Sequence, residues 1–484
     1  MVNPWFIAVA SVILRHSNHT RPEKKVIKKL LWKLMALTAL SALPATLLHA
    51  QIGQVDDTWN GDKALDPSIT RTYVPLGSGV PGLLYQPVQP GAKSRIAVVV
   101  MHGGDYLTFP ACTELSKRGY RVLCANPSGA GDGPLLSVKL AVNYARKYPG
   151  VEKVVLFGHS GGGVLMSTYQ NIAENGLKAC QGPEKLYKCS DSVAALPAAD
   201  GLLLEDANWG IMGLLSLDPA VIDYHDGMKT DPSLDLFNPK NGFKAGGNSD
   251  YSQDFIHRFQ SALARKYNAL VSEAQQRLAL IEAGKGHFKD DEPFPIASGG
   301  SMVPNNKLFA QDVKLMSHTK AAWPLIHADG SVTTEIVHTV RIPQNFEPVT
   351  EYLGMSGSNG TVRAFLRSAV RVADDFSYDE TSIHGVDWRS NYTNPIGNSE
   401  GIHVPLLFVG NTGHWEYLVG EGVYEHAASK DKSLAFMEGA AHPLNTCTPC
   451  EKTPGQYGDT IKPLFDYIDR WLSGNGRFSG GARP

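Results

Sequence analysis

Short apolar runs alternate with helix-like stretches between residues 95 and 206. Runs this short and this apolar are typical of strands covered on both faces of a sheet. Helical patterns separate them, at about 109–118 and 134–148. Strands that alternate with helices predict βαβ units and a mostly parallel sheet. The predicted strands are 95–101, 121–126, 153–157 and 200–204.

The alternation stops for nearly two hundred residues and then resumes. Between 207 and 402 the pattern predicts a long amphipathic helix at 251–283, a hairpin turn at Ala328-Asp329-Gly330 and a helix at 362–374. We therefore expect a large, mainly helical cap, 207–402, inserted between two parts of one core, 51–206 and 403–484. The second part contains predicted strands at 404–409 and 433–439 and predicted helices at 423–429 and 461–472.

The first fifty residues have the pattern of a secretory signal peptide. A basic stretch from Arg21 to Lys33 precedes an apolar run from Leu34 to Leu48, and the small Ala50 suits a signal peptidase. An uncleaved anchor is the alternative, but the run is shorter than the ~20 residues that span a bilayer. We expect a signal peptide at about 21–50, a secreted or periplasmic protein, and no stable membrane span after processing.

The six cysteines fit an oxidising compartment. Close spacing predicts structural disulfides for Cys180 with Cys189 and for Cys447 with Cys450. Cys112 and Cys124 fall in a predicted helix and a predicted strand, so we expect them to be buried thiols.

Charge excludes one class of partner. The 484 residues contain 45 Lys and Arg against 47 Asp and Glu. That balance gives no basic footprint for nucleic acid, and we expect no nucleic-acid partner.

The motif Gly158-x-Ser160-x-Gly162 is the strongest chemical signal. It lies between a predicted strand and a predicted helix, where a tight turn exposes a nucleophilic serine and glycines relieve the crowding. The N–H of Gly161 is a candidate donor to an oxyanion. The earlier strand ends in His102-Gly103-Gly104, whose backbone N–H groups, near Gly104, are the second candidate donor; we expect His102 to be structural.

Serine needs a base to remove its proton, and His442 is the best candidate among sixteen histidines. It follows the last predicted strand, on a loop that can face the serine turn. In this order, strand-HGG, GHSGG turn and GAAH histidine resemble the α/β-hydrolase superfamily over residues 70–206 and 403–484. The resemblance implies a Ser/His/acid triad, an oxyanion hole, and no metal or organic cofactor.

The triad acid departs from the usual pattern of that superfamily. After strand 404–409, where the acid usually lies, the chain has Asn411, Thr412, Gly413 and His414, and no carboxylate before Glu416. A minority of the superfamily takes the acid from the strand after the nucleophile helix, which here ends in Glu205 and Asp206. We prefer Asp206, with Glu416 and Glu205 as alternatives.

These features predict a serine hydrolase that cleaves carboxylic esters through an acyl-enzyme on Ser160. Amide, lactone or carbon–carbon bond hydrolysis on the same triad and a catalytically inactive binding module are the alternatives. Aromatic residues in the cap predict a small-molecule ester substrate with an apolar or aromatic part. They are Trp209, Trp323, Phe346, Tyr352, Phe365, Trp388 and Tyr392.

Overall fold

The structure is a computed structural model that describes residues 65–223, 229–296, 307–343 and 360–478. The chain divides into two units, Met1–Asp56 and Asp57–Pro484, and all described residues belong to the second. The predicted signal peptide lies outside the described residues and stays a prediction.

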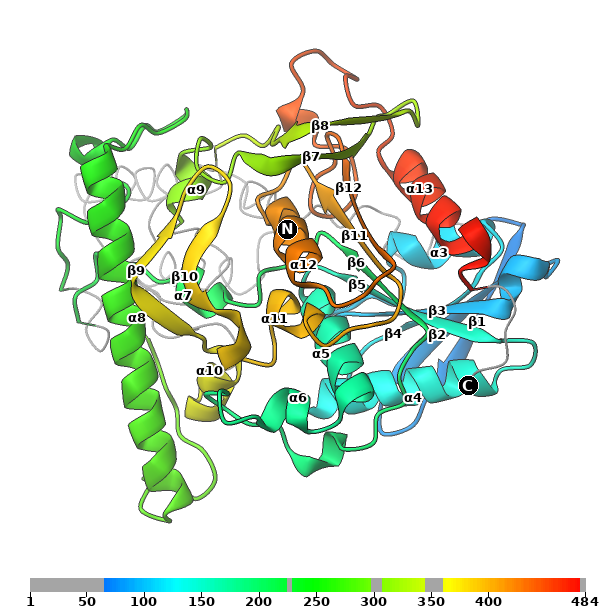
Figure 1. Cartoon of the computed structure of the whole chain (residues 1–484), viewed down its shortest axis with the longest axis horizontal. Coiled ribbons are helices and arrows are strands. Elements are labelled where there is room, and N and C mark those ends of the chain that lie inside the picture. Colours follow the sequence, from blue (N-terminus) through cyan, green and yellow to red (C-terminus); the bar gives the residue numbers. More distant parts are fainter. Residues whose placement is uncertain (1–64, 224–228, 297–306, 344–359, 479–484) are drawn as a thin grey trace, which may run out of the picture. The chain divides into compact units, whose positions relative to one another are not determined.

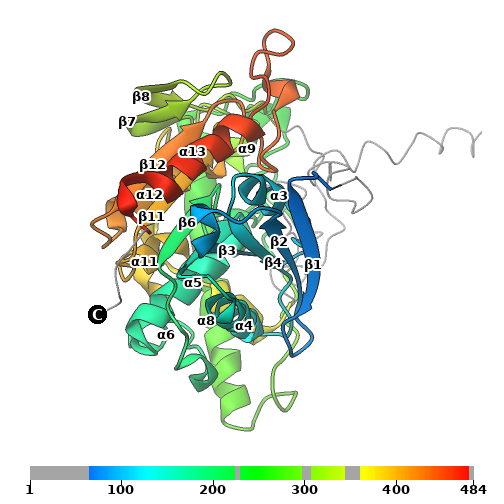
Figure 2. The same cartoon turned by 90° about the vertical axis from the view of Figure 1, so that its right-hand side faces the viewer.

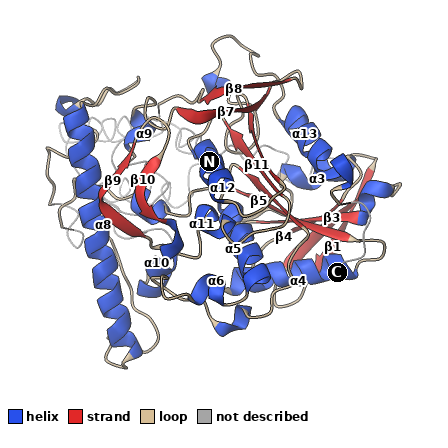
Figure 3. Ribbon diagram, viewed as in Figure 1, coloured by secondary structure: helices blue, strands red, loops and turns tan. Residues whose placement is uncertain are grey.

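A ten-stranded, mostly parallel sheet runs through the second unit (Figures 1 and 3). Six neighbouring strand pairs from β4 to β7 are parallel, and the three pairs nearest the two edges are antiparallel. Across the sheet the strands are β1 (Ile69–Pro75), β2 (Pro81–Pro87), β4 (Arg121–Ala125), β3 (Ile96–Met101), β5 (Lys153–His159), β6 (Gly201–Glu205), β11 (Leu406–Asn411), β12 (Lys432–Met437), β7 (His318–Ile326) and β8 (Val332–His338).

Helices cover both faces of this sheet, which explains the uninterrupted apolar runs of its central strands. In β3, Val99 and Met101 enter one apolar cluster while Val98 and Val100 enter the other. The first cluster includes α4 (Gly133–Lys147), α5 (Gly161–Asn175) and α12 (Val419–His426). The second includes α3 (Pro110–Lys117) and α13 (Ile461–Ser473), which lie side by side in Figure 2. The predicted parallel sheet flanked by helices is confirmed.

The inserted segment is built around one long helix, α8 (Gln253–Glu282). Its buried side chains recur every three or four residues, and the Ser252 hydroxyl caps it by accepting the Phe255 N–H. A separate hairpin, β9 (Arg371–Tyr378) and β10 (Ile383–Asp387), packs against it, as does α10 (Val362–Ser368). Short helices complete the described chain: α6 (Lys178–Gln181), α7 (Met212–Leu215), α9 (Leu308–Gln311) and α11 (Pro395–Ser399).

The hairpin signal at Ala328-Asp329-Gly330 joins β7 to β8, with Gly330 in the left-handed region at a φ of 82°. This hairpin extends the main sheet, because β7 pairs in parallel with β12. The segment 207–402 therefore adds two strands to the core sheet. Its boundaries as a separate cap stay a prediction.

The helix predicted at 362–374 is too long. It ends at Ser368, and β9 begins at Arg371. Val372, Phe376 and Tyr378 are buried in this strand while the residues between them are mostly exposed, so the side-chain period there is two, not 3.6.

Three disulfides close within the described chain. Cys180 with Cys189 and Cys447 with Cys450 confirm the predicted pairs. The prediction of buried thiols for Cys112 and Cys124 is wrong, because these two also form a disulfide. Helix α3 packs against β4 and brings the two Cα atoms to 6.2 Å, within bonding range.

None of the helices in the described ranges combines the length and the apolar character needed to cross a membrane. Even α8, the longest, carries exposed polar residues along one side.

Replacing both Cys112 and Cys124 by Ala should lower the free energy of unfolding by about 3 kcal/mol, because the disulfide closes a loop of 12 residues in the unfolded chain. The Cys447→Ala, Cys450→Ala variant is the matched control. The Cys447–Cys450 disulfide closes a loop of 3 residues, so removing it should lower the free energy of unfolding by less.

Urea unfolding measures both losses, and mass spectrometry after alkylation of the denatured, unreduced protein counts the free thiols. We expect none; two alkylated cysteines at Cys112 and Cys124 would contradict the disulfide.

Candidate active site

Ser160 lies on the tight turn between β5 and α5, at the carboxyl end of the central strands. Its φ of 53° is in the left-handed region, which costs a non-glycine residue about 1–3 kcal/mol. Its side chain is almost buried, with 8% of the residue exposed. A strained serine between a strand and a helix is the geometry of a nucleophile turn.

Two glycines allow this turn to form. A Cβ on Gly158 would overlap the Gly162 carbonyl oxygen, and a Cβ on Gly163 would overlap the Cβ of Ala207. Neither contact involves the far end of a flexible side chain, so neither can be relieved cheaply. Glycine is therefore required at positions 158 and 163, where the start of α5 packs closely against the end of β5 and the residue after β6.

Asp206 follows β6 directly and is fully buried. Its Oδ2 accepts a hydrogen bond of 2.6 Å from Nδ1 of His442, on the loop after β12. Its φ of 39° also lies in the left-handed region. Nucleophile turn, acid and histidine thus follow β5, β6 and β12 in a sheet ordered β1-β2-β4-β3-β5-β6-β11-β12.

The chain has the α/β-hydrolase fold. The fold class predicted from the sequence is confirmed, and Asp206 is the carboxylate that the fold brings to His442. A fold shared by many enzymes does not by itself fix the reaction, so the side chains around this pair decide the chemistry.

A second histidine shares the same carboxylate oxygen. His414, after β11, lies with Nδ1 3.0 Å from Asp206 Oδ2, while the Asn411 N–H donates to Oδ1 at 3.1 Å. Burial alone would raise the pKa of Asp206, but the two histidines outweigh it and hold that pKa below its ordinary value. Asp206 is therefore ionised near pH 7.

The two histidines have opposite pKa shifts. Burial would lower the pKa of His442, but its hydrogen bond to Asp206 and the nearby charge of Glu416 raise it overall. Burial and repulsion by His442 lower the pKa of His414 to about 4, so His414 is neutral near pH 7. The contact of His414 with Asp206 was not predicted from the sequence. The feature that could have indicated it is the position of His414 after β11, where the superfamily usually has the acid.

The alternative acids lie nearby but make different contacts. Glu416 Oε2 lies 3.8 Å from His442 Nε2, too far for a hydrogen bond, and burial raises the pKa of Glu416 to about 8. The Glu205 carboxyl faces His159, with 3.6 Å between Oε2 and Nε2. Burial and the charge of Asp206 raise the Glu205 pKa well above its ordinary value. Neither takes the place of Asp206 at His442 Nδ1.

His159 holds the His442 loop in place. Its Nε2 lies 2.7 Å from the backbone oxygen of His442, and its Nδ1 lies 2.5 Å from the hydroxyl of Tyr106. Its ring also lies near that of His442, with 4.6 Å between centroids. From the sequence, position 159 is only the variable residue of the serine motif. Neighbouring residues in the sequence do not reveal that His159 contacts Tyr106 and His442.

The candidate oxyanion donors differ in whether their N–H groups have a partner among the described residues. Gly161 begins α5, where the first N–H groups have no acceptor within the helix. The Gly104 N–H donates to Nδ1 of His102 at 2.9 Å, and the structural role expected of His102 stays a prediction. An oxyanion role for Gly104 requires this N–H to leave His102, and that role stays a prediction.

Within the described chain, no hydrogen bond joins Ser160 Oγ to His442 Nε2. Such catalytic bonds are often long without substrate and tighten in the complex. The Asp206–His442 half of the arrangement is already formed, and the Ser160–His442 contact still has to close.

Four side chains at this edge could also hold a metal ion. Asp206, His414, Glu416 and His442 each offer one ligand atom, and these atoms lie within 4.8 Å of one another. Imidazole and carboxylate ligands of this kind suit Zn²⁺.

The aromatic residues predicted to line a cap pocket mostly pack inside the protein. Trp209 stacks on Trp388, Phe365 packs in the α8 core, and the Tyr392 hydroxyl donates to Asp132. Trp323 packs against Tyr424 and donates its indole N–H to Glu421. Phe346 and Tyr352 lie outside the described residues.

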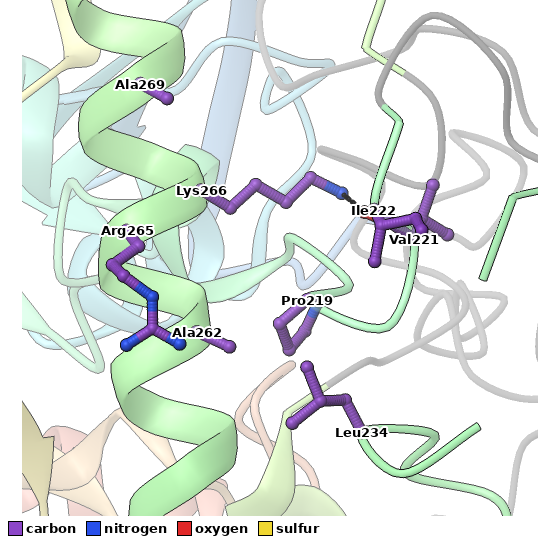
Figure 4. Close-up of a pocket in the computed structure, with 8 residues that line it drawn as sticks. All are labelled: Pro219, Val221, Ile222, Leu234, Ala262, Arg265, Lys266 and Ala269. Atoms are coloured by element: carbon purple, nitrogen blue, oxygen red, sulfur yellow. Dashed lines mark hydrogen bonds between the residues drawn. The ribbon is translucent and has the colours of Figure 1, made fainter. Parts of the chain in front are cut away.

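A cavity of 270 Å³ lies between α8 and residues that include Pro219, Ile222 and Leu234 (Figure 4). It contains no serine, histidine or carboxylate, and Lys266 Nζ in it donates to the backbone oxygens of Asp218 and Val221. The cavity offers no catalytic group and lies outside the candidate site.

No family model and no curated protein matches the sequence. Solved structures match the fold distantly. A hypothetical protein from Pseudomonas aeruginosa is 14% identical, with 86% of this chain and 96% of that one aligned and a TM-score of 0.39. Inhibited esterase B from Lactobacillus rhamnosis is 11% identical, with 92% and 96% aligned and a TM-score of 0.35. The HSL homologue EstE7 from a metagenome library is 12% identical, with 86% and 89% aligned and a TM-score of 0.36.

Gly163→Ala should destabilise the protein by about 1–3 kcal/mol, because the added methyl group overlaps Ala207 and forces α5 away from β6. Urea unfolding measures the loss. Combining it with Ala207→Gly should restore part of the stability, because the second change removes the overlapping Cβ.

Gly213→Ala is the matched control. An added Cβ there meets no atom within 4 Å, so its stability should stay close to that of wild type. Equal stability of Gly163→Ala and this control would contradict the close approach.

Proposed function

We propose that this protein is a serine hydrolase that cleaves carboxylic esters through an acyl-enzyme on Ser160. The observation that carries the proposal is the 2.6 Å bond between His442 Nδ1 and the buried Asp206 carboxylate, next to a strained serine turn. A serine activated by such a pair attacks acyl carbonyls.

His442 acts as the general base. The Asp206 carboxylate accepts its Nδ1–H, which fixes the neutral ring in the tautomer whose Nε2 lone pair can take the Ser160 proton. The serine oxygen then bonds to the ester carbonyl carbon. Asp206 stabilises the imidazolium that forms, and His442 returns the proton to the departing alcohol.

The N-terminus of α5 stabilises the oxyanion. The Gly161 N–H is the first donor of that helix, and its dipole favours negative charge at this end. Gly104 is the second candidate donor. Water, deprotonated by His442, then attacks the acyl-enzyme and releases the acid.

We further propose that the substrate is a small ester with an apolar part. Support comes from the apolar rings beside the site, where Trp415 packs against His414 and Phe309 packs against Trp415. Export from the cytosol is also part of the proposal. Three disulfides among the described residues support it, because such bonds persist in oxidising compartments.

Ser160→Ala should abolish fluorophosphonate labelling and reduce p-nitrophenyl ester turnover by about 10⁴-fold or more, because the nucleophile is gone. His442→Ala should lose a similar factor, because residues of one triad act as a unit. Labelling of the purified protein with parallel initial-rate kinetics measures both.

Ser167→Ala is the matched control, since Ser167 lies on α5 with its hydroxyl bonded to the Val164 carbonyl. It should label like wild type. A folded wild-type protein that neither labels nor turns over esters would favour the non-catalytic binding module. Turnover of amides or lactones in place of esters would reassign the bond cleaved.

Asp206→Asn should lower kcat by about 10⁴-fold while the protein stays folded, because the amide favours the wrong His442 tautomer. Glu416→Gln and Glu205→Gln should lose far less, since neither carboxyl bonds to His442 Nδ1. Steady-state kinetics with a p-nitrophenyl ester ranks the three variants. The reverse ranking of Asp206→Asn and Glu416→Gln would assign the acid to Glu416.

A further inference from the structure

The active-site edge holds more ligand atoms than ester hydrolysis uses. A triad needs one carboxylate and one imidazole beside its serine. Here His414 and Glu416 lie against the same pair, and all four ligand atoms fall within 4.8 Å of one another. His414 and Glu416 tune the pKa values of Asp206 and His442 but neither accepts nor donates a proton in the proposed reaction, so their convergence calls for a further account.

The separations suit a tetrahedral metal site. Metal–ligand bonds of about 2.0–2.2 Å place tetrahedral ligand atoms about 3.3–3.6 Å apart. Asp206 Oδ2 lies 2.6 Å from His442 Nδ1 and 3.0 Å from His414 Nδ1, and Glu416 Oε2 lies 3.9 Å from His414 Nδ1. The second and third separations need shifts of about 0.3 Å to enter the tetrahedral range, whereas Asp206 and His442 must move about 0.7 Å apart and give up their hydrogen bond.

The Glu416 carboxyl is the independent sign of a ligand. It is buried, with 2% of the residue exposed, and its Oε2 accepts no hydrogen bond from any described residue. That oxygen lies 3.8 and 3.9 Å from nitrogens of the two histidines, so it points into the cluster. A buried carboxyl oxygen without a hydrogen-bond partner is costly, and a cation bound in the cluster would displace the carboxyl proton and supply that partner.

We propose that four side chains form a binding site for a divalent transition-metal ion such as Zn²⁺: Asp206, His414, Glu416 and His442. Two imidazoles and two carboxylates are ligands that Zn²⁺ accepts. Two carboxylate charges balance the charge of the ion.

Metal binding and ester hydrolysis exclude one another, a statement that rests on the proposed function. A neutral imidazole has one nitrogen lone pair and one N–H. If His442 binds the ion through Nε2, the lone pair that takes the serine proton is used. If it binds through Nδ1, the proton moves to Nε2, which then cannot act as a base.

Among the described residues, two buried cations oppose the ion. Lys307 lies with Nζ 4.8 Å from the centre of the Trp415 ring, and its charge acts on Glu416. The charge of Arg341 acts on His414. Repulsion by these two charges weakens the site for any cation.

Titration of the purified full-length protein with Co²⁺, followed by visible absorption, tests the site directly. We expect saturation at one ion per chain with the bands of tetrahedral Co²⁺, displacement of Co²⁺ by Zn²⁺, and the same titration in Ser160→Ala. Because Ser160→Ala lacks the nucleophile, its titration tests metal binding independently of hydrolysis.

His414→Gln and Glu416→Gln should each weaken Co²⁺ binding by about tenfold or more, because each removes one ligand. The matched control is His384→Gln, which removes an exposed histidine paired with Asp379 at 2.8 Å outside the cluster. It should bind like wild type. Near-ultraviolet circular dichroism checks that each variant is folded.

Zn²⁺ should also inhibit p-nitrophenyl ester hydrolysis, with an inhibition constant equal to its dissociation constant, and EDTA should restore the rate. The metal site is overturned if folded wild type shows no saturable Co²⁺ binding, or if neither His414→Gln nor Glu416→Gln weakens it. Full ester turnover by the Zn²⁺-saturated protein would overturn the exclusion alone. Co²⁺ binding by a wild type without esterase activity would leave the metal site standing and remove the proposed function.

Discussion

The buried Asp206 carboxylate joins three loops at the carboxyl edge of the sheet. It follows β6, accepts the Asn411 N–H from β11 and the Nδ1–H of His442, and lies 3.0 Å from Nδ1 of His414. An ionised carboxylate without partners could not stay buried, and removing one partner of a buried pair costs about 3–5 kcal/mol. The position of the candidate base therefore depends on this one charge and on the loops that satisfy it.

Local strain accompanies this arrangement. Ser160 and Asp206 are two of the five non-glycine residues with positive φ among the described residues. Such strain persists only where the surroundings impose it. Here the surroundings are the close approach of α5 to β5 and β6, which the small residues Gly158 and Gly163 permit, and the hydrogen bonds that fix the Asp206 side chain. Strain and burial thus occur together where reactive groups must keep fixed directions.

The same burial suits the site to two kinds of chemistry, proton transfer and cation binding. Low solvation and shared acceptors give four titratable side chains different protonation tendencies: Asp206 loses its proton readily, Glu416 keeps its proton, and the two histidines shift in opposite directions. Groups so arranged serve proton transfer when one imidazole keeps its lone pair free. They serve cation binding when that lone pair is donated instead. Which chemistry operates depends on the occupant, while the scaffold stays the same.

The sequence by itself determined the local and periodic features. The apolar runs predicted the central strands because strands covered on both faces need apolar residues throughout, and the Gly-x-Ser-x-Gly spacing predicted the turn because only small residues fit there. The place of His442 after the last predicted strand indicated it as the base. The place of Asp206 after the strand that follows the nucleophile helix made it one of three candidate acids.

Only the tertiary structure shows which of those carboxylates bonds to His442 Nδ1, since Asp206 and His442 are 236 residues apart and the fold alone sets their 2.6 Å contact. The same reason applies to the Cys112–Cys124 disulfide, the β7–β8 hairpin in the main sheet, and the convergence of His414 and Glu416. Each depends on which distant segments pack together, and no local pattern of residues records that.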